Sequence, residues 1–269
     1  MSWRRVSYIL FSLFSFFIIT PIVLVIMGSF GKLWYGTILP TGITLRWYEK
    51  LFTEFFYTRA MIMSLFIGSL TVLVTLSIGL PAVYAIYNST SKKAKTLFDV
   101  ITMVPIAVPP LVIALGLITF YNRKPFNLIG TWEILLLAHV MFTIPFMVRP
   151  IMSNLRQINW RELSEASDSM GAGPWHKVLK ILIPNLMPGI VSGSLMVFAM
   201  SLGEFQLAVL LTGFRTQTFP VVLQQAFYQA TGFACASTSL LIICALSVLW
   251  LVTFILGGRG EKEKMFTIG

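Results

Sequence analysis

The chain has 269 residues, of which 57% are hydrophobic and only 11% are charged, and its mean hydropathy is +0.83. A soluble domain carries roughly 25% charged residues because water must solvate its surface. This composition excludes a water-soluble globule and indicates a protein that has lipid as one of its solvents. The net charge of +10 comes from basic residues in short groups between apolar runs. Such a pattern is typical of membrane-topology signals and does not predict nucleic-acid binding.

Few residues in the chain could hold a metal or perform catalysis. The two cysteines, Cys235 and Cys244, have no CxxC spacing, and the chain has only two histidines. These numbers predict no metal site and no cofactor. A membrane-bound enzyme is also disfavoured, because no paired carboxylates or histidine cluster are present.

The first apolar run, residues 8–27, follows Arg4 and Arg5. It is long enough to cross a hydrocarbon core of ~30 Å, and it is longer than the ~7–15 apolar residues of a signal peptide. We expect a retained span with its N-terminus in the cytoplasm. The polar and aromatic stretch at 28–56 is then an outer loop, with a short interfacial helix near residues 46–52.

Five further apolar runs follow, at 60–87, 97–120, 132–151, 189–213 and 239–257. Together with the first run they predict an all-α, polytopic membrane protein with six transmembrane helices. The third run contains Pro105, Pro109 and Pro110, and each proline removes a backbone hydrogen bond. This run is therefore the one most expected to be bent.

The loop charges predict the orientation. With both termini inside, thirteen Lys and Arg residues are cytoplasmic and seven are outside, the bias that the positive-inside rule requires. The loop at 156–184 also falls on the cytoplasmic side.

That loop is the longest polar stretch expected in the cytoplasm, and its pattern predicts a helix, a break and a second helix. Asn159 or Trp160 can begin the first helix, and residues 171–174, Gly-Ala-Gly-Pro, end it. Pro174 suits the first turn of the second helix. A protruding helix pair of this kind is suited to docking into a groove on another protein.

The same loop resembles the EAA loop of binding-protein-dependent permeases of type I ABC importers. The pattern of that family is Glu-Ala-Ala, three residues, Gly, nine residues and Ile-x-Leu-Pro. The matching residues, with the same spacing, are Glu165, Ala166, Ser167, Gly171, Ile181, Ile183 and Pro184. Ser167 stands where Ala is usual and Ile183 where Leu is usual; both changes are conservative in size or polarity.

The resemblance implies a type I importer permease fold, with a first span and outer loop at 1–56, a core at 57–257 and a cytoplasmic tail at 258–269. It implies that the loop at about 156–184 seats in a cytoplasmic ATP-binding cassette ATPase, two copies of which drive a pair of permease subunits. The second permease would be a paralogue or a second copy, and an extracytoplasmic binding protein would deliver the solute.

The resemblance also implies roles for single residues of this loop. Glu165 would supply charge, Gly171 the turn, and Trp175 with Leu179 an apolar stripe. The residues expected to form this coupling loop are Glu165, Ala166, Ser167, Gly171, Trp175, Leu179, Ile181 and Pro184. The chain has no Gly-x-x-x-x-Gly-Lys-Ser/Thr loop of its own, so ATP hydrolysis would belong to another subunit.

Glu204 lies within the fifth apolar run, where an ionisable group is costly. It is a candidate for the substrate pathway. The alternative is a structural glutamate hydrogen-bonded near Ser201 and Gln206. His139, in the fourth run, is expected to be a packed, hydrogen-bonded histidine rather than a proton relay.

Segments 34–48 and 143–149 resemble the polyamine and 2-aminoethylphosphonate permeases, so that group of solutes is preferred. Ferric iron, thiamine, sulfate and molybdate stay open. The competing class is a secondary transporter or channel that needs no ATPase; it would show inverted repeats and several intramembrane charges, which this sequence lacks.

Overall fold

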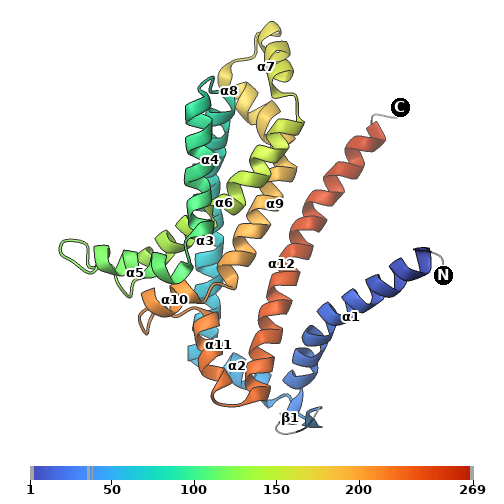
Figure 1. Cartoon of the computed structure of the whole chain (residues 1–269), viewed down its shortest axis with the longest axis vertical. Helices are drawn as coiled ribbons and strands as arrows, with labels where there is room; N and C mark the ends of the chain where they lie inside the picture. The colour runs from blue at the N-terminus through green and yellow to red at the C-terminus, as the bar shows by residue number, and fades with distance from the viewer. Residues whose placement is uncertain (1–2, 35–36, 38, 267–269) are drawn as a thin grey trace. The chain divides into compact units, whose positions relative to one another are not determined.

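The computed structural model describes residues 3–34, 37 and 39–266 and is mostly helical (Figure 1). The chain forms two compact units. One contains Met1–Ala60 and Val221–Gly269, and the other contains Met61–Pro220.

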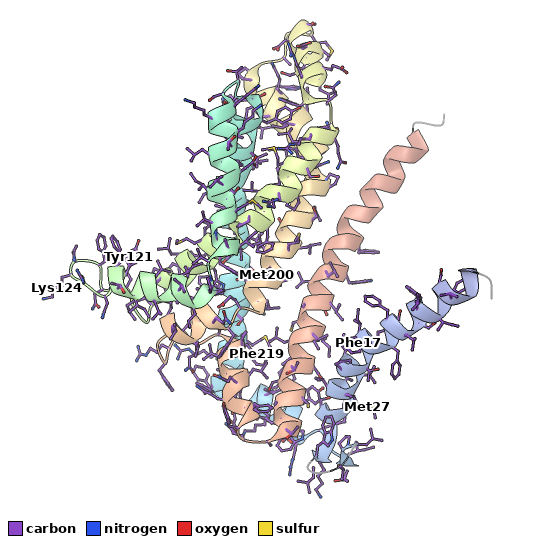
Figure 2. The ribbon with its side chains drawn as sticks, viewed as in Figure 1. Phe17, Met27, Tyr121, Lys124, Met200 and Phe219 are labelled. Atoms are coloured by element: carbon purple, nitrogen blue, oxygen red, sulfur yellow. The ribbon has the colours of Figure 1, made fainter. Side chains whose placement is uncertain are left out.

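The first unit pairs the two ends of the chain. Its elements are α1 (Trp3–Ser29), β1 (Gly31–Leu33), β2 (Thr41–Ile43), α2 (Arg46–Thr53) and α12 (Thr231–Phe266). Helices α1 and α12 pack together. Apolar side chains of α1 face outward along its length; Phe17 is 78% exposed (Figure 2), as expected for a helix that faces lipid.

Helix α2 is the short helix predicted near residues 46–52. Its Trp47 Nε1 donates a hydrogen bond to the Gly31 carbonyl (2.8 Å), and the Trp47 ring lies 6.2 Å from that of Phe233. Strands β1 and β2 pair antiparallel, with Gly31 opposite Ile43. This hairpin is not predictable from the sequence, because three-residue strands are too short to produce an alternating pattern.

The second unit holds most of the remaining helices. They are α3 (Phe55–Asn88, which begins in the first unit), α4 (Lys92–Ala107), α5 (Pro110–Tyr121), α6 (Trp132–Gln157), α7 (Trp160–Ser169), α8 (Pro174–His176), the π-helix η1 (Lys177–Leu182), α9 (Ile183–Leu202) and α10 (Gln206–Leu211). Helix α11 (Phe219–Phe227) crosses the boundary back into the first unit.

The spans confirm the predicted membrane architecture. Among the described residues, five helical segments are long and apolar enough to cross a membrane, and the number is six if α4 and α5 form one broken span. These two helices meet at 98°, across Val108 and Pro109. The third run is therefore bent at its prolines, as predicted.

Two predicted boundaries are wrong. The fifth run was expected to be one span at 189–213, but its helix ends at Leu202 and α10 follows after a break. The helix instead extends in the other direction, to Pro174. The sixth helix begins at Thr231 and not near residue 239. Both predicted boundaries depend on hydropathy alone. Hydropathy does not detect a break between two apolar segments.

The most extensive helix contact in the second unit is between α6 and α9. At Gly189 an added Cβ would lie 2.8 Å from Asn154 Cβ and 2.9 Å from the Pro150 carbonyl oxygen; at Gly193 it would lie 3.1 Å from the Met147 carbonyl. The Gly189 N–H donates to Asn154 Oδ1 (3.2 Å). Two glycines four residues apart thus let the backbones approach closely, as small residues do between membrane helices.

Candidate functional site

Helices α7 and α8 lie together at one end of the long helices of the second unit (Figure 1). Helix α7 begins at Trp160, one of the two starts predicted, with Glu162 in its first turn. An acidic residue there is favoured by the partial positive charge of the helix N-terminus. Ser167 is buried, and its hydroxyl donates to the Ser164 carbonyl (2.9 Å). The polar atom that distinguishes Ser167 from the usual alanine is therefore satisfied locally.

The C-terminus of α7 is closed by a Schellman motif. The Gly171 N–H donates to the Asp168 carbonyl (2.9 Å), and the Ala172 N–H donates to the Ser167 carbonyl (3.0 Å). Gly171 has φ +75°, in the left-handed region that favours glycine. An added Cβ would meet no atom within 4 Å, so the backbone angle and not a steric clash selects glycine here.

The chain then reverses into a second helix. Pro174 occupies the first turn of α8, as predicted, and the π-helix η1 follows, with the Ile183 N–H donating to the Val178 carbonyl. The π-helix immediately precedes Pro184, whose ring would clash with the Lys180 carbonyl in a regular α-helix. The proline of the sequence motif thus accounts for the local widening of the helix.

The segment Pro174–Leu202 has 29 residues, which at 1.5 Å per residue corresponds to ~43 Å. A hydrocarbon core is only ~30 Å thick, so several residues must extend beyond it. His176, Lys177 and Lys180 identify the N-terminal turns as the part that protrudes.

The structure brings the predicted coupling residues onto one helix–turn–helix element. Trp175 is 78% exposed and Leu179 is 56% exposed. Glu165 is exposed and accepts a hydrogen bond from Arg161 Nε (2.9 Å). Ala166 and Pro184 are also exposed, whereas Ile181 is half-buried. Large exposed apolar side chains beside charges, outside the lipid-facing part of a helix, are typical of a docking surface.

Trp160 anchors this element, a role that the sequence analysis did not assign. The Trp160 side chain is 2% exposed and belongs to the apolar core that contains Leu155 and Leu182. Its ring meets that of Tyr84 edge-on, with centroids 6.0 Å apart. The base of α7 is therefore fixed to α3, α6 and η1, although its tip is exposed.

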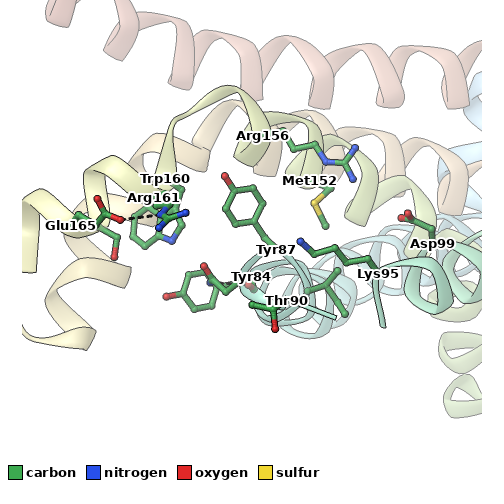
Figure 3. A pocket seen from close by; sticks show the side chains of 13 residues that line it. Tyr84, Tyr87, Thr90, Lys95, Asp99, Met152, Arg156, Trp160, Arg161 and Glu165 are labelled. Atoms are coloured by element: carbon green, nitrogen blue, oxygen red, sulfur yellow. Dashed lines mark hydrogen bonds and ion pairs between the residues drawn. The ribbon is translucent and has the colours of Figure 1, made fainter. Parts of the chain in front are cut away.

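A polar cavity of about 730 Å³ lies beside α7 (Figure 3). Its charged lining residues are Lys95, Asp99, Arg156, Arg161 and Glu165. Tyr84, Tyr87 and Trp160 contribute aromatic walls. Because such a lining must be solvated, this end of the unit faces water and not lipid.

Glu204 lies in the break between α9 and α10, not within a span. Its side chain is buried, and its carboxylate accepts hydrogen bonds from the Leu207 N–H (2.9 and 3.0 Å) and the Ala208 N–H (3.1 Å). It therefore caps the first turn of α10. This geometry supports the structural alternative, and the substrate-pathway role of Glu204 stays a prediction.

His139 is a packed, hydrogen-bonded histidine, as expected. It is 1% exposed, and its Nδ1 lies 2.7 Å from Ser201 Oγ on α9. Its Nε2 lies 3.9 Å from Glu204 Oε2. The three side chains connect α6 to the α9–α10 break. The Gly130 N–H donates to the Leu211 carbonyl (3.0 Å) and holds the other end of α10.

Comparisons with known proteins agree on one family. A model described as "binding-protein-dependent transport system inner membrane component" matches residues 76–259. The spermidine/putrescine permease PotC of Haemophilus influenzae is 29% identical, over 75% of this chain and 76% of its own. The molybdenum permease ModB of Escherichia coli is 27% identical, over 77% of this chain and 95% of its own. PhnV of Salmonella paratyphi A, provisionally assigned to 2-aminoethylphosphonate transport, is 28% identical, over 78% of each chain.

Solved structures show the same fold. A chain of a bacterial ABC transporter that imports the polysaccharide alginate aligns with a TM-score of 0.74 at 17% identity, over 96% of both chains. A chain of the MetNI methionine ABC transporter aligns with a TM-score of 0.62 at 20% identity, over 75% of this chain and 94% of its own. At these identities the likeness is one of fold.

The family model extends from within α3 into α12 and so covers more than half of the chain. The apolar spans and the fold of the structural neighbours agree with that match. The chain therefore belongs to the family of binding-protein-dependent transport system inner membrane components, as an integral inner-membrane permease subunit of an ABC importer.

Proposed function

We propose that this permease couples solute passage to ATP hydrolysis through the α7–α8 element, which docks onto a separate cytoplasmic ATPase. The observation that carries this proposal is the exposure of Trp175 and Leu179 on a protruding helix pair whose base is buried. A rigid base with an apolar tip suits an element that transmits movement.

The rest of the assembly follows from the same proposal. One ATPase would bind each of two permease subunits, of which the second is a paralogue or another copy of this chain. A binding protein outside the membrane would deliver the solute. One structural neighbour, the bacterial alginate ABC transporter, is described in complex with a periplasmic protein that holds an alginate pentasaccharide. Both termini and the α7–α8 element would face the cytoplasm, as the thirteen-to-seven charge bias favours.

The proposed solute is small and polar, with polyamines and aminophosphonates preferred. PotC and PhnV, which match this chain at 29% and 28% identity, support this group. Molybdate is supported by ModB at 27%. Since these identities are so close, uptake measurements must choose among the solutes.

The experiment is to express the chain with the proteins encoded beside it, purify it by a tag and measure the ATPase that copurifies. Trp175→Ala with Leu179→Ala should reduce the copurified ATPase by roughly tenfold or more, because truncating a buried interface tryptophan is often costly. The control is Tyr228→Ala, which removes an equally exposed aromatic ring from the first unit. Uptake of spermidine, 2-aminoethylphosphonate and molybdate is measured on the same cells.

Unchanged ATPase recovery with the double variant would refute docking through this element. Solute uptake by the chain without any ATPase would favour the alternative, a secondary transporter or channel.

A further inference from the structure

Lys177 is the first residue of η1, and it contacts α7 across the turn. Its Nζ lies 2.5 Å from Asp168 Oδ1 and 3.4 Å from Ser164 Oγ. Only 16% of the Lys177 side chain is exposed, against 61% of the Asp168 side chain. The lysine therefore lies along the inner side of the helix pair, with its ammonium group held between two residues one turn apart on α7.

The turn joins the two helices through backbone bonds at the end of α7. The Schellman bonds close only the end of α7, and the connection to Pro174 runs through Gly171 and Gly173. At the base, Trp160 packs in the same apolar core as Leu182 and Val178. Among the described residues, the polar side-chain bonds between α7 and η1 all come from Lys177. Lys177 is therefore a second point of attachment, closer to the tip.

Two points of attachment between α7 and η1 fix the angle between these helices, whereas a single point constrains that angle less. Without the Lys177 bonds, no polar side-chain bond between described residues of α7 and η1 would fix the angle between the two helices. With Lys177 bonded to Ser164 and Asp168, α7 and the helix that begins at Pro174 are held as one body. An ion pair that is partly open to water contributes little to folding stability, so its main effect is on this angle.

We propose that Lys177 is a positioning residue for coupling: it fixes α7 against η1, so that movement of the docked tip reaches α9 without being lost in the turn. This inference rests on the proposed docking function. It assigns to Lys177 no contact with the ATPase or with the solute.

The test is Lys177→Met, which keeps the length of the side chain but removes its charge. Lys180→Met is the matched control, because Lys180 lies on the same π-helix, is exposed and makes no bond to a described residue of α7. For Lys177→Met we expect normal ATPase copurification and an unchanged thermal unfolding midpoint. Stimulation of ATP hydrolysis by loaded binding protein, and solute uptake, should fall roughly tenfold. Lys180→Met should match the unmodified chain in every readout.

A charge reversal identifies the cause. Lys177→Asp and Asp168→Lys should each reduce stimulated hydrolysis, and the two together should restore most of it, because the bond re-forms with its charges exchanged. Lys177→Arg should retain coupling. If the exchanged pair is no better than either single variant, or if Lys177→Met transports normally, the inference is wrong.

The outcomes also separate this inference from the docking proposal. If the Trp175 and Leu179 variant loses the ATPase while Lys177→Met transports normally, docking holds and only the inference fails. If both variants retain the ATPase and full uptake, the docking proposal itself is wrong.

Discussion

Gly171 shows how one backbone angle can constrain a functional loop. Its φ of +75° lies in the left-handed region, and the two bonds of the Schellman motif depend on that angle. Residues with a Cβ lose about 1–2 kcal/mol in this conformation, asparagine least and β-branched residues most.

We therefore expect the loss of uptake to be smallest for Gly171→Asn, larger for Gly171→Ala and largest for Gly171→Val, which should be close to inactive. The chain should still insert into the membrane, since an added Cβ meets nothing within 4 Å. Uptake and stimulated ATP hydrolysis measure the effect.

Gly173→Ala is the control for this series. Gly173 also has open space around it, but its φ is −66°, which any residue can adopt. Equal losses at the two positions would show that the left-handed angle is not the reason for glycine at 171.

The ion pair that Glu165 forms with Arg161 does not by itself explain a function for Glu165. Its ion pair with Arg161 is exposed on both sides, with side-chain exposures of 66% and 86%. Such pairs contribute little stability, ~0–1 kcal/mol. A function for Glu165 would therefore come from the partner that it meets and not from the ion pair.

At the scale of elements, the sequence predicted the parts that local chemistry determines. Residues 171–174 predicted the end of α7 and the start of α8 because Gly and Pro have strong backbone preferences. The prolines at 109 and 110 likewise predicted the bend between α4 and α5. The charge bias and the spacing of the coupling motif were also readable without a structure.

The break at Glu204 could not be predicted in the same way. The stretch from Gly189 to Gly213 is apolar on both sides of the break, so hydropathy reports a single run. The contacts that hold the segment around this break include two that are distant in sequence, from Ser201 at the end of α9 to His139 and from Leu211 at the end of α10 to Gly130. A periodicity argument cannot detect contacts between residues so far apart. For the same reason the role of Trp160 as the anchor of α7 is not predictable from the sequence.

The cap on α10 leads to a prediction for Glu204. Glu204→Gln keeps an oxygen that can accept from the Leu207 N–H, so we expect near-normal yield and uptake. Glu204→Leu leaves the buried amides of Leu207 and Ala208 without their acceptor, at a cost of about 1–3 kcal/mol, and should reduce folded protein. Membrane yield, uptake and ATP hydrolysis of both variants are the measurements.

A different pattern would favour the substrate-pathway role. If Glu204→Gln is made at normal yield and still hydrolyses ATP but loses uptake, the charge itself is required, and the cap would then be incidental.

At the scale of the whole molecule, the proposed orientation can be tested at one exposed position of α7. In a background in which Cys235 and Cys244 are replaced by Ala, Ser169→Cys should react with a membrane-impermeant thiol reagent only after the cells are opened. Lys32→Cys, on the proposed outer side, should react in intact cells. Rapid labelling of Ser169→Cys in intact cells would reverse the orientation.

The close contact between α6 and α9 has a mechanical consequence. Gly189 and Gly193 lie near the middle of the continuous helix Pro174–Leu202, with the turn of the docking element at one end and Glu204 just beyond the other. If the helix tilts about this contact, it acts as a lever. At 1.5 Å per residue the arm from Gly189 to Pro174 is about 22 Å long and the arm from Gly193 to Leu202 is about 14 Å long, so a tilt of about 10° moves the two ends by roughly 4 and 2 Å in opposite directions. The helix would then pivot at the two glycines. In the proposed docking function, a displacement of Trp175 by the ATPase would move the α9–α10 break in the opposite direction.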